Sequence, residues 1–220
     1  MGFTGYTIRT GLMLVTMLTC VVCWSLIPRP RKLHFTLFGA LAIIASVTEL
    51  TGFILTLAGR LTYYFYNAYA LVELLFVMGI AARDDRGPQR LALGVSIAGA
   101  AGLVVKAWVD GSFGPALFEG ILLASVLQAM VLMVLLWRMA IASARPLQTV
   151  PEFWQSMGLL IYFGGMAPLF TLIKYVYATD REVANVLWTL MPFLCILRYA
   201  MGAWSCVLER RDVLRGSHGQ

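Results

Sequence analysis

The sequence predicts an all-α integral membrane protein, a single bundle of seven transmembrane helices. Of its 220 residues, 60% are hydrophobic and only 13% are charged, and the mean hydropathy is +0.80. A chain of this composition cannot fold around one water-soluble core. A helix needs about 20 apolar residues to cross the hydrocarbon region of a bilayer. Charge clusters and Gly or Pro residues divide the chain into seven such stretches: 8–28, 35–58, 61–82, 91–108, 115–138, 154–177 and 184–208.

Aromatic residues support these boundaries, because indole rings prefer the headgroup level of a membrane. All six tryptophans fall near the ends of predicted spans: Trp24, Trp108, Trp137, Trp154, Trp188 and Trp204. Tyr63, Tyr64 and Tyr66 mark the start of the third span. The first span lacks an A-x-A-like cleavage site and is followed by basic residues, so we expect it to be retained.

The segments between the spans are short. We therefore expect one transmembrane domain over residues 1–208 and a short basic cytoplasmic tail over residues 209–220. Pro168 and Pro192 each remove a backbone donor from a helix, and we expect each to kink its span.

Arginine and lysine are distributed unequally between the two sets of loops. The loops after the first, third and fifth spans, together with the C-terminal tail, carry Arg29, Arg31, Lys32, Arg83, Arg86, Arg90, Arg138, Arg145, Arg210, Arg211 and Arg215. The other set carries Arg9, Arg60 and Arg181, near Asp110, Asp180 and Glu182. Because basic loops stay in the cytoplasm, we predict a multi-pass protein of the cell (inner or plasma) membrane, with its N-terminus outside and its C-terminus in the cytoplasm. This bias accounts for the net charge of +6, and no nucleic-acid partner is expected.

Six ionisable residues lie within the predicted spans: Glu49, Glu73, Lys106, Glu119, Lys174 and Arg198. A charge at the bilayer centre costs about 2.5 kcal/mol or more, so each should face the protein interior and find a partner. At about 1.5 Å rise per residue, Glu49, Glu73 and Arg198 fall near the midplane and the other three lie in the outer third.

Each midplane charge shares a helix face with small or polar residues: Ser46, Gly52 and Thr56 with Glu49; Tyr66 and Tyr69 with Glu73; Cys195, Gly202 and Ser205 with Arg198. We predict that Arg198 bridges Glu49 and Glu73, and that Tyr66, Asn67 and Tyr69 satisfy the remaining lone pairs. Two carboxylates against one guanidinium leave an uncompensated charge, so we expect Glu49 or Glu73 to keep a proton near neutral pH. The alternative is a purely structural network that fixes helix register.

The outer polar group consists of Lys106, Glu119, Lys174 and Thr171. Lys106 and Glu119 lie at similar depth on consecutive helices and are expected to pair, and a lysine stem can extend to the headgroups. Lys174 and Thr171 share a face with Gly164 and Ala167, which suits either close helix packing or a cavity open to the outside.

Several chemistries can be set aside. A zinc hydrolase needs several histidines, and only His34 and His218 occur. A retinal protein would need a lysine in the middle of its last helix, where this chain has Arg198. Cys20, Cys23, Cys195 and Cys206 are interpreted as small apolar side chains packed between helices. We therefore expect no catalytic residue, no metal, no cofactor and no enzymatic activity.

Three motifs are distributed over most of the chain: Glu-x-x-Gly at 49–52, Tyr-Asn-x-Tyr-x-x-x-Glu at 66–73, and Phe-Trp-x-Ser-x-Gly-x-x-x-Tyr-Phe-Gly at 153–164. In these motifs the chain resembles a class of short bacterial seven-helix membrane proteins of unassigned role. The resemblance implies the same fold and brings no activity with it.

Two functions fit these observations. The first is a receptor-like or accessory and structural subunit that works through another membrane protein or a homo-oligomer, because the loops are too short to catalyse a reaction. The second is a transporter of protons or of a small polar solute that uses Glu49, Glu73 and Arg198.

Overall fold

The computed structural model describes residues 3–82, 86–109, 118–177 and 179–217. Its helices are α1 (Phe3–Ser25), α2 (Leu33–Leu57), α3 (Tyr63–Ala81), α4 (Arg86–Val109), α5 (Phe118–Ala142), the short 3-10 helix η1 (Leu147–Thr149), α6 (Pro151–Tyr177), α7 (Arg181–Trp188) and α8 (Met191–Ser217). Seven helical segments, with α7 and α8 taken together, are long and apolar enough to cross a membrane. The predicted all-α bundle is therefore confirmed. Residues 115–117, where we expected the fifth span to start, lie outside the described residues.

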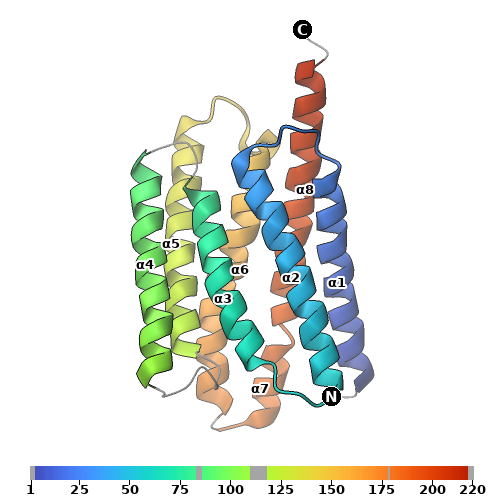
Figure 1. The fold of residues 1–220 in the computed structure, drawn as a ribbon, viewed down its shortest axis with the longest axis vertical. Coiled ribbons are helices and arrows are strands. Elements are labelled where there is room, and N and C mark those ends of the chain that lie inside the picture. Colours follow the sequence, from blue (N-terminus) through green and yellow to red (C-terminus); the bar gives the residue numbers. More distant parts are fainter. Residues whose placement is uncertain (1–2, 83–85, 110–117, 178, 218–220) are drawn as a thin grey trace.

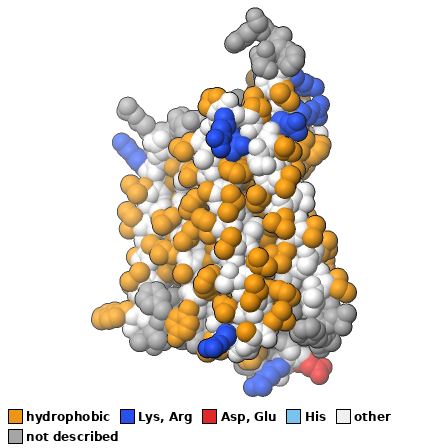
Figure 2. All heavy atoms as spheres, turned by 45° about the vertical axis from the view of Figure 1, so that its right-hand side comes forward, with side chains coloured by type: hydrophobic (Ala, Val, Ile, Leu, Met, Phe, Trp, Pro, Cys, Tyr) orange, Lys and Arg blue, Asp and Glu red, His pale blue; other side chains and the backbone are white. Residues whose placement is uncertain are grey.

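Successive long helices run in opposite directions (Figure 1). The C-terminal ends of α1, α3 and α5 therefore lie at the same end of the bundle as the C-terminal end of α8, and we call this the basic end. Lys and Arg side chains gather at this end on the face shown in Figure 2, whereas hydrophobic side chains cover the middle of the bundle. The charge separation expected from the loops is thus present in the fold. Which end faces the cytoplasm stays a prediction.

The long helices form a ring that follows chain order. α1 packs on α2, α2 on α3, α5 on α6, and α6 on α8, and α8 closes the ring against α1. α4 packs on both α3 and α5, which also contact each other, so α4 covers the outside of that corner. The main core cluster draws on α1 to α6 and α8. Its centre is not purely apolar, because Arg198 is the largest fully buried side chain in the described part of the chain.

The seventh span is two helices. α7 ends at Trp188 and α8 begins at Met191, with a turn at Thr189 and Leu190. Pro192 causes this break, since it lacks the N–H that would continue α7 but is tolerated in the first turn of α8. The expected kink is therefore a complete interruption at this proline, whereas α6 continues through Pro168. α8 also continues across residue 209, where we expected a tail to begin, and ends at Ser217.

Hydroxyl side chains within the spans mostly bond to their own helix. Thr16, Thr19, Ser46, Thr51, Thr56, Ser96 and Thr171 each donate to the carbonyl oxygen four residues earlier, at 2.7 to 2.9 Å. A hydroxyl satisfied in this way needs no partner on another helix and can face lipid. Ser46, Thr56 and Thr171 were expected on polar helix faces. Their hydroxyl groups thus donate within their own helices and not to another helix.

Trp24 joins α1 to α2. Its indole Nε1 donates to the carbonyl oxygen of Phe35 at 2.8 Å, and the guanidinium of Arg31 lies 4.3 Å from the ring centroid. Gly39 makes room for the indole, because a Cβ at this position would lie 2.0 Å from a ring carbon. Trp24 is therefore a packing residue, unlike Trp108 and Trp137, which are exposed to the surroundings as expected of interfacial anchors.

We predict that Gly39→Ala lowers the free energy of unfolding by about 1–3 kcal/mol, the usual range for overpacking a tight contact. The indole cannot move aside without losing its hydrogen bond to Phe35. Gly94→Ala is the matched control, since a Cβ at Gly94 meets nothing within 4 Å. The test is thermal unfolding in detergent, measured as the fraction of the protein that stays monodisperse. Equal midpoints for the two variants would contradict this account of Gly39.

Candidate functional site

An ion pair lies at the centre of the bundle. Arg198 on α8 donates from Nη1 to Oε1 of Glu73 on α3, and the two side chains are almost fully buried, with only 1% and 9% of their side-chain surface exposed. The pair spans the interior of the ring, because α3 and α8 are not neighbours in it. Each charge would be strongly disfavoured at this depth without the other.

Tyr69 completes the carboxylate side of the pair. Its hydroxyl donates to Oε1 of Glu73 at 2.9 Å, from one turn earlier on α3. Residues four apart lie on one face of a helix, so the local sequence alone brings these two groups together. The expected contact between Tyr69 and Glu73 is therefore confirmed.

Aromatic rings surround the guanidinium. The Cζ atom of Arg198 lies 4.6 Å from the ring centroid of Tyr162, 5.5 Å from that of Phe163 and 5.1 Å from that of Tyr199. Nε and Nη2 of Arg198 have no hydrogen-bond acceptor in the described part of the chain. Ring faces attract a cation and partly replace those acceptors.

α6 brings its rings to Arg198 through a close approach of two backbones. A Cβ at Gly158 would lie 3.0 Å from the carbonyl oxygen of Arg198. Gly158 and Tyr162 are four residues apart and share a helix face. The face of α6 that approaches α8 at Gly158 is therefore the face that carries Tyr162. Both belong to the motif at 153–164.

Sequence reasoning missed these aromatic residues, although a signal was present. Tyr162 lies in the middle of its span instead of near an end, where a tyrosine in lipid would place its hydroxyl. The position indicated a buried polar partner.

Glu49 lies apart from the central ion pair. Its Oε2 accepts a hydrogen bond from the Tyr66 hydroxyl at 3.1 Å, which joins α2 to α3. Gly52 leaves room for this tyrosine, because a Cβ at position 52 would lie 2.4 Å from the tyrosine hydroxyl oxygen. The expected bridge from Arg198 to Glu49 is absent among the ion pairs of the described residues, since Arg198 pairs with Glu73. Asn67 is buried on α3, and its expected role at the carboxylates stays a prediction.

The outer polar group forms around Glu119 in the first turn of α5. Lys106 on α4 lies 3.4 Å from its Oε2, as expected, and Lys174 on α6 donates to its Oε1. One carboxylate thus joins three helices. Thr171 does not contribute its hydroxyl, which donates to the carbonyl oxygen of Ala167 at 2.9 Å.

A third cluster lies at the basic end, and sequence reasoning did not identify it. Lys32 Nζ lies 3.0 Å from Oε1 of Glu152 on α6 and 3.0 Å from Oε2 of Glu209 on α8. Nε2 of His34 is 3.5 Å from Oε1 of Glu152. Partial burial lowers the pKa of Lys32, but hydrogen bonds and charge from Glu152 and Glu209 outweigh it and raise the pKa above its usual value. Lys32 therefore stays charged, and its ion pairs hold the α1–α2 connection against α6 and α8.

The described residues contain no group of three or more His, Cys, Asp or Glu side chains placed to hold a metal ion. Comparison with protein-family models, with curated proteins and with solved structures finds no match for this chain. The candidate site consequently stands on its geometry: a buried Glu73–Arg198 pair with Tyr69, Tyr162, Phe163 and Tyr199 around it, and a separate Glu49–Tyr66 contact.

We predict that Glu73→Gln and Arg198→Gln each lower the free energy of unfolding by about 3–5 kcal/mol, because each leaves one buried charge without its partner. The double variant Glu73→Gln/Arg198→Gln contains neither charge and should recover much of this loss. A double-mutant cycle of thermal or denaturant unfolding in detergent measures the coupling. Strictly additive losses would show that the pair does not stabilise the bundle.

The two mid-membrane carboxyls differ in the charge of the group that contacts them. Glu73 has a cation beside it, whereas the described contact of Glu49 is a neutral hydroxyl. We expect Glu49 to be the carboxyl that stays protonated at neutral pH, because an ionised form would lack a compensating charge. Infrared spectroscopy of the reconstituted protein should show a carboxylic-acid band at pH 7 that Glu49→Gln removes. Glu119→Gln is the control and should leave the band in place, since Glu119 is paired with lysines.

Proposed function

We propose that this chain is a receptor-like or accessory subunit that acts through another membrane protein, and that its buried polar centre fixes the packing of the bundle. The observation that carries the proposal is the enclosure of Arg198. Its guanidinium is paired with Glu73, stacked against three rings and almost completely buried. Charges that carry a solute across a membrane line a path that water or the solute can enter. Packed rings on the guanidinium support a structural role instead.

The connections support the same conclusion. The connections that lie wholly within the described residues, at 26–32, 58–62, 143–150 and 189–190, are short. Short connections hold no catalytic domain, so a signal or a stabilising effect would pass through lateral contacts between helices. The partner in this proposal is another membrane protein or a second copy of this chain.

A second candidate function rests on Glu49. This carboxyl is only half-buried and lies outside the sealed ion pair, between α2 and α3. A carboxyl at mid-membrane that can bind and release a proton is a typical part of a proton-coupled transporter. The alternative is therefore a transporter of protons or of a small polar solute in which Glu49, and not Arg198, carries the exchangeable charge.

Two measurements on the same preparation separate these functions. We expect the chain, purified from its own membrane in mild detergent, to retain a partner at fixed stoichiometry, and the complex to re-form from the purified components. We expect proteoliposomes with a pH-sensitive dye inside to show no flux above that of empty vesicles. Flux that Glu49→Gln abolishes and Glu119→Gln preserves would favour the transporter. A monomer that shows neither partner nor flux would contradict the accessory role.

A further inference from the structure

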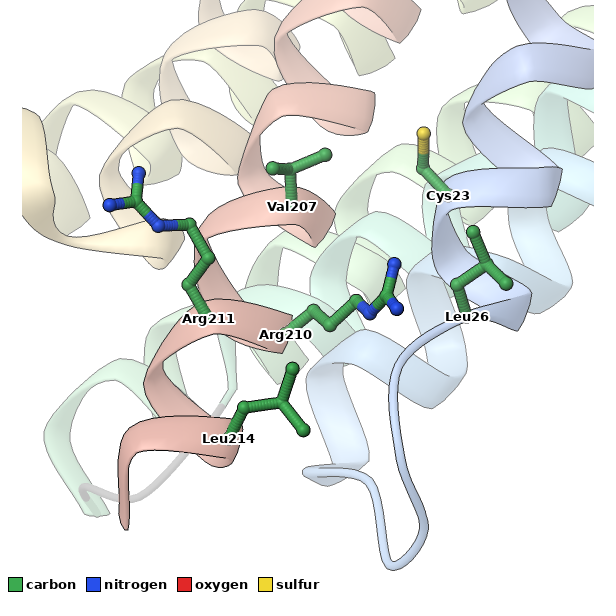
Figure 3. A pocket seen from close by; sticks show the side chains of 6 residues that line it. All are labelled: Cys23, Leu26, Val207, Arg210, Arg211 and Leu214. Carbon is green, nitrogen blue, oxygen red and sulfur yellow. The ribbon is translucent and has the colours of Figure 1, made fainter. Parts of the chain in front are cut away.

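A groove opens between α1 and α8 at the basic end of the bundle. It has a volume of about 170 Å³ and is lined by Cys23, Leu26, Val207, Arg210, Arg211 and Leu214. Its walls are almost entirely apolar apart from the two arginines. Figure 3 shows the Arg210 side chain reaching from α8 toward Leu26, whereas Arg211 leaves α8 on the other side. The groove thus combines an apolar surface with the Arg210 guanidinium beside it.

The acidic side chains nearest in sequence do not neutralise these arginines. Glu209 is turned inward, with Oε2 3.0 Å from Lys32 Nζ. Asp212 lies 4.0 Å from Arg145. Arg210 and Arg211 have no ion-pair partner among the residues that the structure describes, and both are exposed. An anion in the groove therefore meets the uncompensated charge of Arg210, whereas the Arg211 guanidinium lies on the other side of α8.

We propose that this groove binds one anionic phospholipid, with its phosphate at Arg210 and the first part of an acyl chain along Leu26, Cys23 and Val207. A guanidinium matches the geometry of a phosphate and donates to two of its oxygens. Basic pockets between transmembrane helices are the usual binding sites for anionic headgroups. This proposal is independent of the function proposed above, because it needs only the groove and the charges.

The position of the groove selects a lipid over other occupants. It lies at the end of the bundle where basic residues gather, the level at which headgroups are expected. Val22 on α1 and Leu26 directly after this helix expose more than half of their surface, so the groove is continuous with the lipid-facing side of the bundle. An acyl chain can leave the groove along this face without crossing a polar surface.

The test is native mass spectrometry of the full chain in detergent, titrated with phosphatidylglycerol or with phosphatidylcholine of the same acyl chains. We expect the wild type to bind phosphatidylglycerol more tightly. Arg210→Gln should weaken that binding about fivefold, which corresponds to the attraction of one basic residue for an anionic lipid surface. Arg211→Gln, whose guanidinium leaves α8 on the other side, should weaken it less than Arg210→Gln, and both variants should leave phosphatidylcholine binding unchanged.

Two controls distinguish a site from a general attraction. Arg90→Gln removes one exposed arginine on α4, outside the groove, and should leave the affinity for phosphatidylglycerol unchanged. Val207→Phe keeps both arginines but fills the groove, and it should reduce the affinity. Soluble glycerol phosphate, added at the same concentration as the lipid, should not compete.

Three outcomes would overturn the proposal. Equal losses for Arg210→Gln and Arg90→Gln would mean that the lipid responds only to net charge. Full competition by glycerol phosphate would mean that the site takes a free phosphate ester and not a lipid. A change of oligomeric state in Arg210→Gln, with lipid binding unaltered, would mean that the groove is a contact between protein chains.

Discussion

The Glu73–Arg198 ion pair is the constraint on which the interior of this bundle depends. In a low-dielectric interior neither charge is tolerated alone, so α3 and α8 must face each other across the ring although they are not packed as neighbours. The remaining features of the centre follow from this requirement. Tyr69 donates to the carboxylate, and Gly158 lets α6 bring Tyr162 against the guanidinium.

Ion pairs at three depths join helices of the bundle. At the basic end, Lys32 connects the α1–α2 loop to α6 and α8. At the centre, Arg198 connects α8 to α3, and near the opposite end Glu119 connects α5 to α4 and α6. Lipid tails are as apolar as leucine, so the hydrophobic effect does not favour one alignment of two apolar helix surfaces over another. Charged contacts at fixed positions set the register that apolar packing alone leaves free.

The candidate site was only partly predictable. Periodicity identified the contact between Tyr69 and Glu73, because both residues lie on one helix. Depth identified Arg198 and Glu73 as partners, because both fall near the midplane. The assignment of Glu49 to the same arginine was wrong, since depth says nothing about the rotation of α2 around its axis. In the structure, Glu49 bonds to the Tyr66 hydroxyl on α3, and Gly52 leaves room for this hydroxyl.

The sequence by itself determined the number of spans, their alternating direction and the separation of basic residues to one end, because these follow from the length and hydropathy of local segments. Even the break before α8 is local, since Pro192 lacks a backbone donor. Tertiary structure decided which charges meet, which helix covers which, and that Glu209 is buried against Lys32 instead of free in a tail. The physical reason is that hydropathy fixes the depth of a residue in the membrane, whereas the rotation and order of the helices are fixed by close packing between segments far apart in the chain.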